Sequence, residues 1–257
     1  PYISPGVSAM YVLAFATLEV GLFGLLSRRI KIATIRNNLF FFLIIGFLVA
    51  ASTNINYEAV AFIDPGTASL LSQTSIIFGL ALGLLWLRDK LTKRQLIGAL
   101  IAITGVLIIT FQPGDYLRLG SLMVLISAFL YALHAAVTKR YGSDIDFVDF
   151  FFSRLLFTTS FLFIFALGRQ QLALPSGKAL LILILVGTVD VVISRTLYYK
   201  TLRRMNMSVH AIILTLSPVV TVLWSLLLFS TFPSWVQLIG GVAVILGVLV
   251  VMHNHPS

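Results

Sequence analysis

Residues 95–107 read QLIGALIAITGVL, and residues 237–249 read QLIGGVAVILGVL. The same offset of 142 residues aligns further pairs without a gap: Tyr57 with Tyr199, Ser75 with Ser217, and GVL at 105–107 with GVL at 247–249. Two apolar helices can look alike by chance, but here a polar Gln and spaced glycines match too. The offset therefore predicts an internal repeat, with one half at 1–114 and the other at 115–257.

The composition places the chain in a membrane. Of its 257 residues, 59% are hydrophobic and 11% are charged, and its mean hydropathy is +1.02. Soluble domains carry about a quarter charged residues, so this sequence cannot cover a water-facing surface. Cysteine is absent, which excludes a disulfide framework, a thiolate metal site and a cysteine nucleophile. We expect no metal and no cofactor.

Nine stretches are long and apolar enough to cross a bilayer as helices. A hydrocarbon core about 30 Å thick needs roughly 20 helical residues. The stretches lie at 6–27, 38–56, 67–87, 95–112, 120–138, 147–168, 178–199, 208–230 and 234–253. We therefore predict an all-α fold, a polytopic bundle with nine transmembrane helices in this chain.

The basic residues gather in alternate loops. One set of loops holds thirteen of the 18 Lys and Arg residues: Arg28, Arg29, Lys31, Arg36, Arg88, Lys90, Lys93, Arg94, Lys139, Arg140, Lys200, Arg203 and Arg204. The opposite loops hold only Arg118, Arg169 and Lys178. Because basic loops stay in the cytoplasm, we expect the C-terminus there. The net charge of +9 is thus dispersed along the chain, which argues against nucleic acid as a partner.

The loop charges also orient the two halves. They predict that the helix at 67–87 is directed toward the cytoplasm and that its repeat partner at 208–230 is directed away from it. Inverted halves are typical of secondary transporters, whose substrate site lies near the midplane between them. The span at 120–138 has its repeat partner at about −22 to −4. The offset therefore predicts a tenth helix upstream and an inverted five-plus-five repeat.

These repeats resemble a known family. Residues 67–111, TASLLSQTSIIFGLALGLLWLRDKLTKRQLIGALIAITGVLIITF, and their echo at 216–251, LSPVVTVLWSLLLFSTFPSWVQLIGGVAVILGVLVV, look like the paired EamA repeats of the drug/metabolite transporter superfamily. The resemblance covers nearly the whole chain, and the first helix of the family's pattern has no counterpart in these residues. It implies a ten-helix carrier of the bacterial inner (plasma) membrane that exports or exchanges small metabolites, often amino acids, without ATP.

Two motif positions of that family differ between the halves. The Ser-Pro in the fourth helix of each repeat is present as Ser217-Pro218, whereas the first half has Ser75-Ile76. The acidic position after that helix is Asp89 in the first half and Thr231 in the second. These departures leave the expected fold intact and leave the substrate open.

Four ionisable residues fall within the spans: Glu19, Arg154, Asp190 and Arg195. Each costs about 2.5–3.5 kcal/mol at mid-helix, so we expect it to face a cavity or an opposite charge. One interpretation is two buried ion pairs that hold helices in register. The other is that Arg154 binds an anionic substrate group through its planar guanidinium, while Asp190 or Glu19 holds a substrate amine or carries a proton.

Polar side chains at helical spacing supply the other candidates for substrate binding. Asp190 shares one predicted α-helical face with Ser194 and Tyr198, whereas Arg195 lies about 140° away around the helix. The remaining candidates on the third, fifth and eighth spans are Gln73, Tyr131, His134, Ser217 and Trp224. The proline after Ser217 is expected to free a backbone carbonyl one turn back. Each candidate has a structural alternative, because hydroxyls and single histidines often hold helices together.

Small residues recur at helical spacing in three spans. They are Gly79 with Gly83, then Gly98, Ala102 and Gly105, and finally Gly240, Ala243 and Gly247. Such faces let helices approach closely, so we interpret them as packing surfaces and not as sites.

Other functional classes lack their motifs. The sequence contains no H-E-x-x-H or G-x-S-x-G of hydrolytic enzymes and no G-x-x-x-x-G-K-[ST] of ATP-driven pumps. We therefore expect no catalytic residues, and we predict a secondary-active exporter or exchanger of small metabolites such as amino acids. A channel-like pore and a carrier of larger metabolites such as nucleotide-sugars are the alternatives. The expected partners are a small-molecule substrate and the lipid bilayer, with homodimerisation left open.

Overall fold

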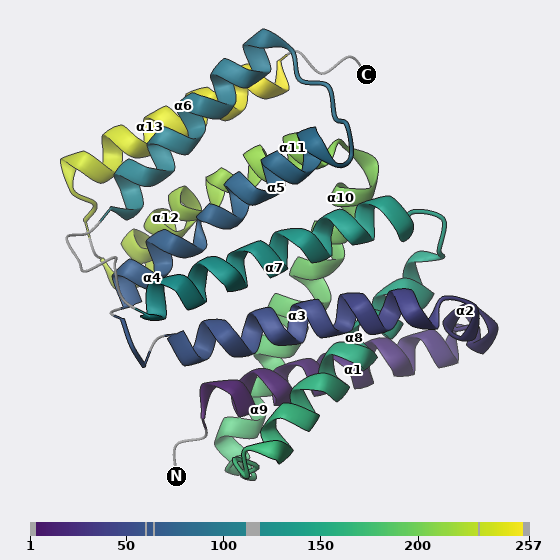
Figure 1. The fold of residues 1–257 in the computed structure, drawn as a ribbon. Coiled ribbons are helices and arrows are strands. Elements are labelled where there is room, and N and C mark those ends of the chain that lie inside the picture. The colour runs from purple at the N-terminus through teal and green to yellow at the C-terminus, as the bar shows by residue number, and fades with distance from the viewer. Residues whose placement is uncertain (1–3, 60, 64, 112–118, 231, 254–257) are drawn as a thin grey trace. The chain divides into compact units, whose positions relative to one another are not determined.

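The computed structural model describes residues 4–59, 61–63, 65–111, 119–230 and 232–253. Every regular element in these ranges is a helix (Figure 1). Nine segments there are long and apolar enough to cross a membrane, and each corresponds to a predicted span. The largest difference is in the seventh, which continues to Arg204 and not only to residue 199. The predicted all-α polytopic bundle is confirmed.

Several spans consist of more than one helical element. In chain order the elements are α1 (Pro5–Leu26), α2 (Ile32–Asn37), α3 (Leu39–Ala59), α4 (Pro65–Ser72), α5 (Thr74–Leu85), α6 (Lys93–Thr110), α7 (Leu119–Tyr141), α8 (Phe147–Gly168), α9 (Gly177–Val186), the π-helix η1 (Gly187–Ser194), α10 (Arg195–Arg204), α11 (Met207–Ile213), the 3₁₀-helix η2 (Leu214–Leu216), α12 (Ser217–Phe229) and α13 (Trp235–Met252). The third, seventh and eighth spans are therefore interrupted helices.

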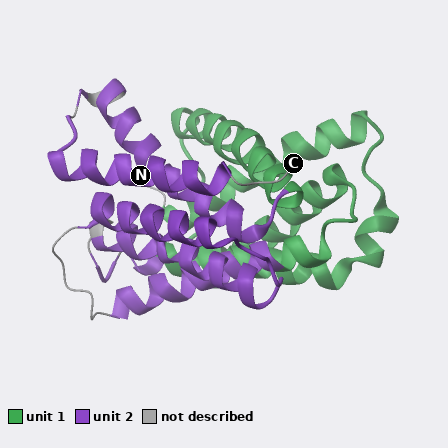
Figure 2. Cartoon of the chain, turned by 90° about the horizontal axis from the view of Figure 1, so that it is seen from above, with its two compact units in different colours: residues 1–57, 137–204 green, residues 58–136, 205–257 purple. Residues whose placement is uncertain are grey.

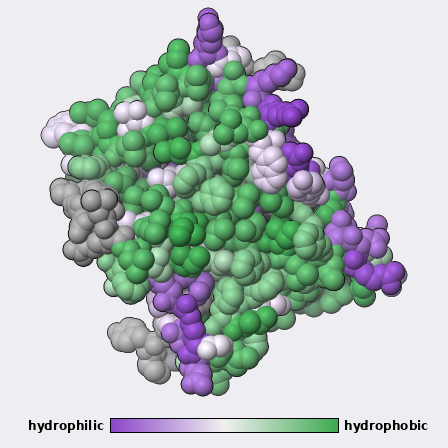
Figure 3. Space-filling model, viewed as in Figure 1, coloured by the Kyte–Doolittle hydropathy of each residue, from purple (hydrophilic) through white to green (hydrophobic). Residues whose placement is uncertain are grey.

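The surface of the protein suits a lipid environment. Figure 3 shows a broad hydrophobic face, with hydrophilic residues gathered at its margins. Large apolar side chains such as Leu22, Phe40, Leu181 and Leu246 are each more than half exposed. Soluble monomers rarely expose contiguous apolar patches of this extent. Together with the nine apolar helices, this surface identifies an integral membrane protein.

The helices form two compact units, each with segments from both halves of the sequence (Figure 2). Unit 1 comprises Pro1–Tyr57 and Val137–Arg204, and unit 2 comprises Glu58–Ala136 and Met205–Ser257. Helices α3 and α7 pass from one unit to the other. The compact units are thus not the predicted halves 1–114 and 115–257, whose boundary lies outside the described residues and stays a prediction.

In unit 1, α1 and α8 pack as an antiparallel pair. Gly24 lies near Val148 and Gly21 lies against Phe152, so residue numbers increase along one helix as they decrease along the other. A Cβ on Gly21 would lie 2.8 Å from the Phe152 ring, so a larger residue here would have to displace that ring. Farther along, the hydroxyls of Thr17 and Thr159 share a hydrogen bond with their oxygens 3.1 Å apart. These two threonines are separated in sequence by 142 residues, the repeat offset.

In unit 2, α6 and α13 form an antiparallel pair with reciprocal glycine contacts. A Cβ on Gly98 would lie 2.7 Å from the carbonyl oxygen of Gly247, and one on Gly105 would lie 2.7 Å from that of Gly240. The predicted packing role of these glycines is confirmed. One member of the predicted face is wrong, because Val244, and not Ala243, is fully buried between them.

The sequence repeat is also a repeat of backbone structure. Adding 142 to the bounds of α1 gives those of α8, and adding 142 to those of α6 gives those of α13. Both α6 and α13 begin with a capping box, Thr92 with Gln95 and Ser234 with Gln237. The non-glycine residues with positive φ in the described chain also pair at this offset: Arg28 with Gln170, and Arg88 with Ser230. Equivalent helices therefore begin and end in the same way.

Candidate functional site

Arg154 is a buried cation in unit 1. It lies on α8, whose first turn is capped by the Asp146 side chain. The α-helical rise places it about 10 Å along the helix from Phe147. The Arg154 side chain is 3% exposed. Its Nε and Nη1 are buried and have no hydrogen-bond partner among the described residues.

An aromatic platform lies beneath this guanidinium. The Cζ of Arg154 is 5.0 Å from the ring centroid of Tyr199 on α10, and Tyr199 is completely buried. Phe150 packs edge-on against Tyr199, with ring centroids 5.3 Å apart. The negative face of an aromatic ring attracts a cation but accepts no conventional hydrogen bond in the guanidinium plane. The platform therefore orients Arg154 and leaves its N–H donors available.

The ion-pair interpretation does not hold for Arg154. Neither Glu19 nor Asp190 pairs with it in the described chain. Leaving a buried charge without a partner is costly, so water or an anionic ligand has to satisfy these donors. A planar fork of N–H groups matches the two oxygens of a carboxylate.

Glu19 faces the π-helix of the seventh span. The Thr188 hydroxyl in η1 donates a hydrogen bond to Glu19 Oε1 at 2.8 Å. Close approach of η1 to α1 depends on Gly187, where a Cβ would lie only 2.9 Å from the carbonyl oxygen of Val12. π-Helical turns are rare and occur often at functional sites. The half-buried Glu19 carboxylate is thus held beside an irregular helix.

The π-helix changes the relation between Asp190 and its neighbours. Asp190 and Ser194 both lie within η1 and are exposed, whereas Tyr198 lies on α10 and is half-buried. The predicted shared face assumed 100° per residue, and this spacing does not hold where hydrogen bonds join residues five apart. The predicted angle of about 140° to Arg195 fails for the same reason. Tyr198 packs edge-on against Tyr199 at 5.0 Å, which places it beside the platform under Arg154.

In unit 2, two helices are interrupted at equivalent positions. α4 ends at Ser72 and α5 begins at Thr74, so Gln73 lies at the break. Adding 142 to 73 gives 215, the middle residue of η2 between α11 and α12. Interrupted helices at matching positions of two repeats are the best structural pointers to a transporter's substrate site. Gln73, which is half-buried, gains support from this position.

The second break differs from its prediction. The proline after Ser217 was expected to free the carbonyl one turn back, but the Ser217 N–H donates to the Leu214 carbonyl in a 3₁₀ turn. Tightening the helix here satisfies the orphaned group, so no free carbonyl is available to a ligand. Ser217 is exposed, as is Trp224 farther along α12.

Tyr131 and His134 on α7 contact one another. His134 is completely buried, and its Nδ1 is 2.5 Å from the Tyr131 carbonyl oxygen. Their ring centroids are 4.7 Å apart. This contact within one helix fixes the imidazole, so it supports the structural alternative for His134 at least as well as a binding role.

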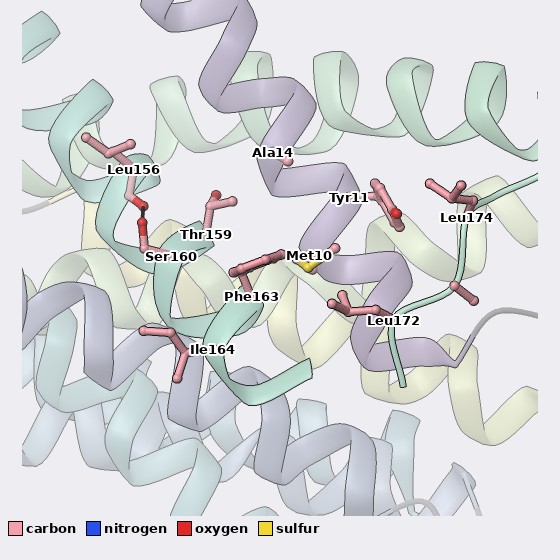
Figure 4. Close-up of a pocket in the computed structure, with 11 residues that line it drawn as sticks. Met10, Tyr11, Ala14, Leu156, Thr159, Ser160, Phe163, Ile164, Leu172 and Leu174 are labelled. Atoms are coloured by element: carbon pink, nitrogen blue, oxygen red, sulfur yellow. Dashed lines mark hydrogen bonds between the residues drawn. The ribbon is translucent and has the colours of Figure 1, made fainter. Parts of the chain in front are cut away.

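A groove of about 730 Å³ lies apart from these residues. It is bordered by α1, α8 and residues 172–174 (Figure 4). Its lining is apolar except for a few hydroxyls, among them Tyr11 and Thr159, and includes no predicted site residue and no charge. The groove therefore offers no anchor for an ionic solute.

Sequence reasoning missed two residues of unit 1. Tyr199 was recognised only as the repeat partner of Tyr57, and its burial beneath Arg154 depends on how α8 and α10 pack. Asp149 was also overlooked. It is 1% exposed, its Oδ1 accepts a hydrogen bond from the Lys31 backbone N–H at 2.7 Å, and its Oδ2 has no partner among the described residues. Its position in the first turn of α8 was the available signal.

Several known proteins are similar to this chain. It is 26% identical over 189 residues to the uncharacterized transporter YdfC of Bacillus subtilis, an alignment that covers 72% of this chain and 62% of YdfC. Solute carrier family 35 member F5 of Bos taurus is 27% identical over 176 residues, covering 62% of this chain and 33% of the bovine protein. The chain thus matches less than two thirds of the length of either relative.

A solved crystal structure shares the fold. It superposes with a TM-score of 0.85 at 15% sequence identity, covering 98% of this chain and 89% of the other. The sequence profile of the EamA-like transporter family matches twice, at residues 1–111 and 118–253. These two matches cover both repeats and nearly the whole chain. The chain therefore belongs to the EamA-like transporter family and is an integral membrane protein.

Proposed function

We propose that the protein is a secondary-active carrier that exports or exchanges small metabolites such as amino acids. The observation that carries the proposal is the Arg154 guanidinium, which is buried over Tyr199 with two nitrogens lacking a hydrogen-bond partner among the described residues. A carboxylate is the common group of small metabolites that fits this fork. A substrate amine would then be held by Glu19 or Asp190.

Alternating access between two inverted repeats is the proposed mechanism. The antiparallel, reciprocal contacts of α6 with α13 support it, because a two-fold axis in the membrane plane generates this pattern. The matching breaks at Gln73 and in η2 support it further. The loop charges favour an inner-membrane protein with a cytoplasmic C-terminus.

An uptake screen in proteoliposomes tests the function. Radiolabelled amino acids and other small carboxylates are offered to the purified protein, with and without a pH gradient. We expect saturable uptake of at least one carboxylate that exceeds uptake into protein-free vesicles. The absence of saturable flux for every amino acid, amine and carboxylate would contradict the proposal.

Proton coupling through Glu19 predicts a specific pH response. Because protonation of a carboxylate would accompany each cycle, wild-type exchange should depend on pH, and Glu19→Gln should flatten that dependence. The matched variant Thr188→Val removes the hydroxyl that donates to Glu19 and keeps the carboxylate, so its rate should still vary with pH. A flat wild-type profile would exclude this role of Glu19.

A further inference from the structure

The two repeats differ at one contact within unit 2. Helix α5 packs against α11, and the two lie side by side in Figure 1. The equivalent contact would join α12 to α4, since each is the repeat partner of one member of the first pair. In the part of the chain that the structure describes, α4 and α12 do not pack in this way. One contact is therefore closely packed, while its counterpart among the described residues is not.

Two glycines allow the closed contact. A Cβ on Gly79 would lie 3.3 Å from the Ala211 Cβ. A Cβ on Gly83 would lie 2.9 Å from the Ser208 backbone nitrogen and would collide with the Ser208 hydroxyl. Gly79, Ser208 and Ala211 are buried. We call these four residues the gate contact.

Asp89 fastens one end of the gate contact. The backbone turns at Arg88, which has φ 59°, and the Asp89 N–H then donates to the Gly83 carbonyl at 2.9 Å. This turn brings Asp89 Oδ2 within 2.8 Å of the Ser208 backbone N–H in the first turn of α11, from which it accepts a hydrogen bond. The Asn206 side chain makes no capping hydrogen bond there. The carboxylate of Asp89, in the segment after α5, caps α11 in its place.

The counterpart positions lack these features. Thr221 and Ser225 stand where the first repeat has Gly79 and Gly83, and the position equivalent to Asp89 is Thr231, which lies outside the described residues. Thr221 is exposed, and so is Ser69, the counterpart of Ala211. Leu223 and Trp224 on α12 are each more than half exposed. Among the residues that the structure describes on this side of unit 2, no equivalent contact closes α12 on α4.

We propose that the gate contact is one of two alternating gates and that Asp89 is the residue that holds it shut. This inference rests on the proposed alternating access. When the gate contact opens, α12 closes on α4 and brings Thr221 to Ser69, as the repeat relation requires. The charged hydrogen bond from Asp89 exists only at the first gate. It biases the resting carrier toward closure at the end where Lys90, Lys93 and Arg94 lie.

Paired cysteines test both gates, because the 257 residues of this sequence include no cysteine. A Gly79→Cys, Ala211→Cys pair has Cβ atoms close to disulfide distance in this structure, and oxidation should link it and stop transport until a reductant is added. A Ser69→Cys, Thr221→Cys pair should link only slowly in the wild-type background. Reversal by reductant and a monodisperse elution profile show that each protein is folded.

Removing Asp89 should exchange the two results. In an Asp89→Ala background, we expect the Ser69–Thr221 cysteine pair to link at least about tenfold faster, because a hydrogen bond to a charged group shifts an equilibrium by more than one factor of ten. Linkage of the Gly79–Ala211 pair should slow correspondingly. Asp144→Ala is the control, because it removes an exposed carboxylate of unit 1 and should change neither rate.

The outcomes separate the gate from the transport proposal. If the Ser69–Thr221 cysteine pair never links in a protein that transports substrate, or if Asp89→Ala leaves both rates unchanged, the gate assignment is wrong. If the cysteine rates exchange as described but no solute is transported, the gate stands and the proposed function fails. Cross-linking rates can be measured without knowing the substrate, so the gate can be tested separately from transport.

Discussion

Replacing Arg154 with leucine is expected to abolish transport while leaving the folded protein as stable as the wild type, or more stable. The guanidinium is 3% exposed and has two nitrogens without a partner among the described residues. Two charge-assisted hydrogen bonds to a substrate contribute roughly 1.5–3 kcal/mol each. Losing both should lower transport efficiency by at least about 100-fold. Removing an uncompensated buried charge should not destabilise the fold.

Two measurements on the same variants distinguish binding from a structural role. Initial rates in proteoliposomes report transport, and the melting temperature in detergent reports stability. Arg154→Lys keeps the charge over Tyr199 but loses the planar fork, so we expect transport between those of wild type and Arg154→Leu. If Arg154→Leu transports normally, the residue does not bind substrate. If it lowers transport only in proportion to a large loss of stability, Arg154 holds the fold.

Replacing Gly240 with leucine should strongly destabilise unit 2. A Cβ at this position would lie 2.9 Å from the carbonyl oxygen of Gly105 and 2.8 Å from the Ile109 side chain. Because a backbone atom cannot move aside without displacing α6, we expect a loss of roughly 3 kcal/mol. The measurement is the melting temperature of the purified protein.

The adjacent glycine is a matched control in the same helix. A Cβ on Gly241 would meet no other atom within 4 Å, and replacing glycine in a helix interior gains up to about 1 kcal/mol of intrinsic propensity. Gly241→Leu should therefore leave the melting temperature unchanged or raise it. Equal losses at Gly240 and Gly241 would show that the reciprocal packing of α6 and α13 is not what stabilises unit 2.

The fold was predictable because its signals are strong over long stretches. Each span is a run of apolar residues of membrane-crossing length, and the 142-residue offset rests on Gln95 with Gln237 and on the paired glycines. The same features appear in the structure as capping boxes and reciprocal contacts. The two compact units could not be predicted, because they depend on packing between helices distant in sequence.

The candidate site was predictable only in part. Arg154 could be predicted as a candidate because a charged residue within an apolar span is readily recognised in the sequence. The π-helix around Asp190 has no comparable sequence signal, because Gly187–Ser194 resembles an ordinary apolar stretch. The break at Gln73 contains neither glycine nor proline, and only comparison with η2 reveals that it recurs. The Tyr199 platform depends on tertiary packing that no local pattern encodes.

Counterflow is the measurement that tests the carrier mechanism most directly. Proteoliposomes containing the full chain are loaded with unlabelled substrate at saturating concentration, and entry of the labelled substrate is followed over time. We predict that internal substrate accelerates labelled entry, that the rate saturates with external concentration, and that Arg154→Leu shows neither effect. Labelled entry that rises linearly with concentration and ignores internal substrate would contradict a carrier and indicate a pore.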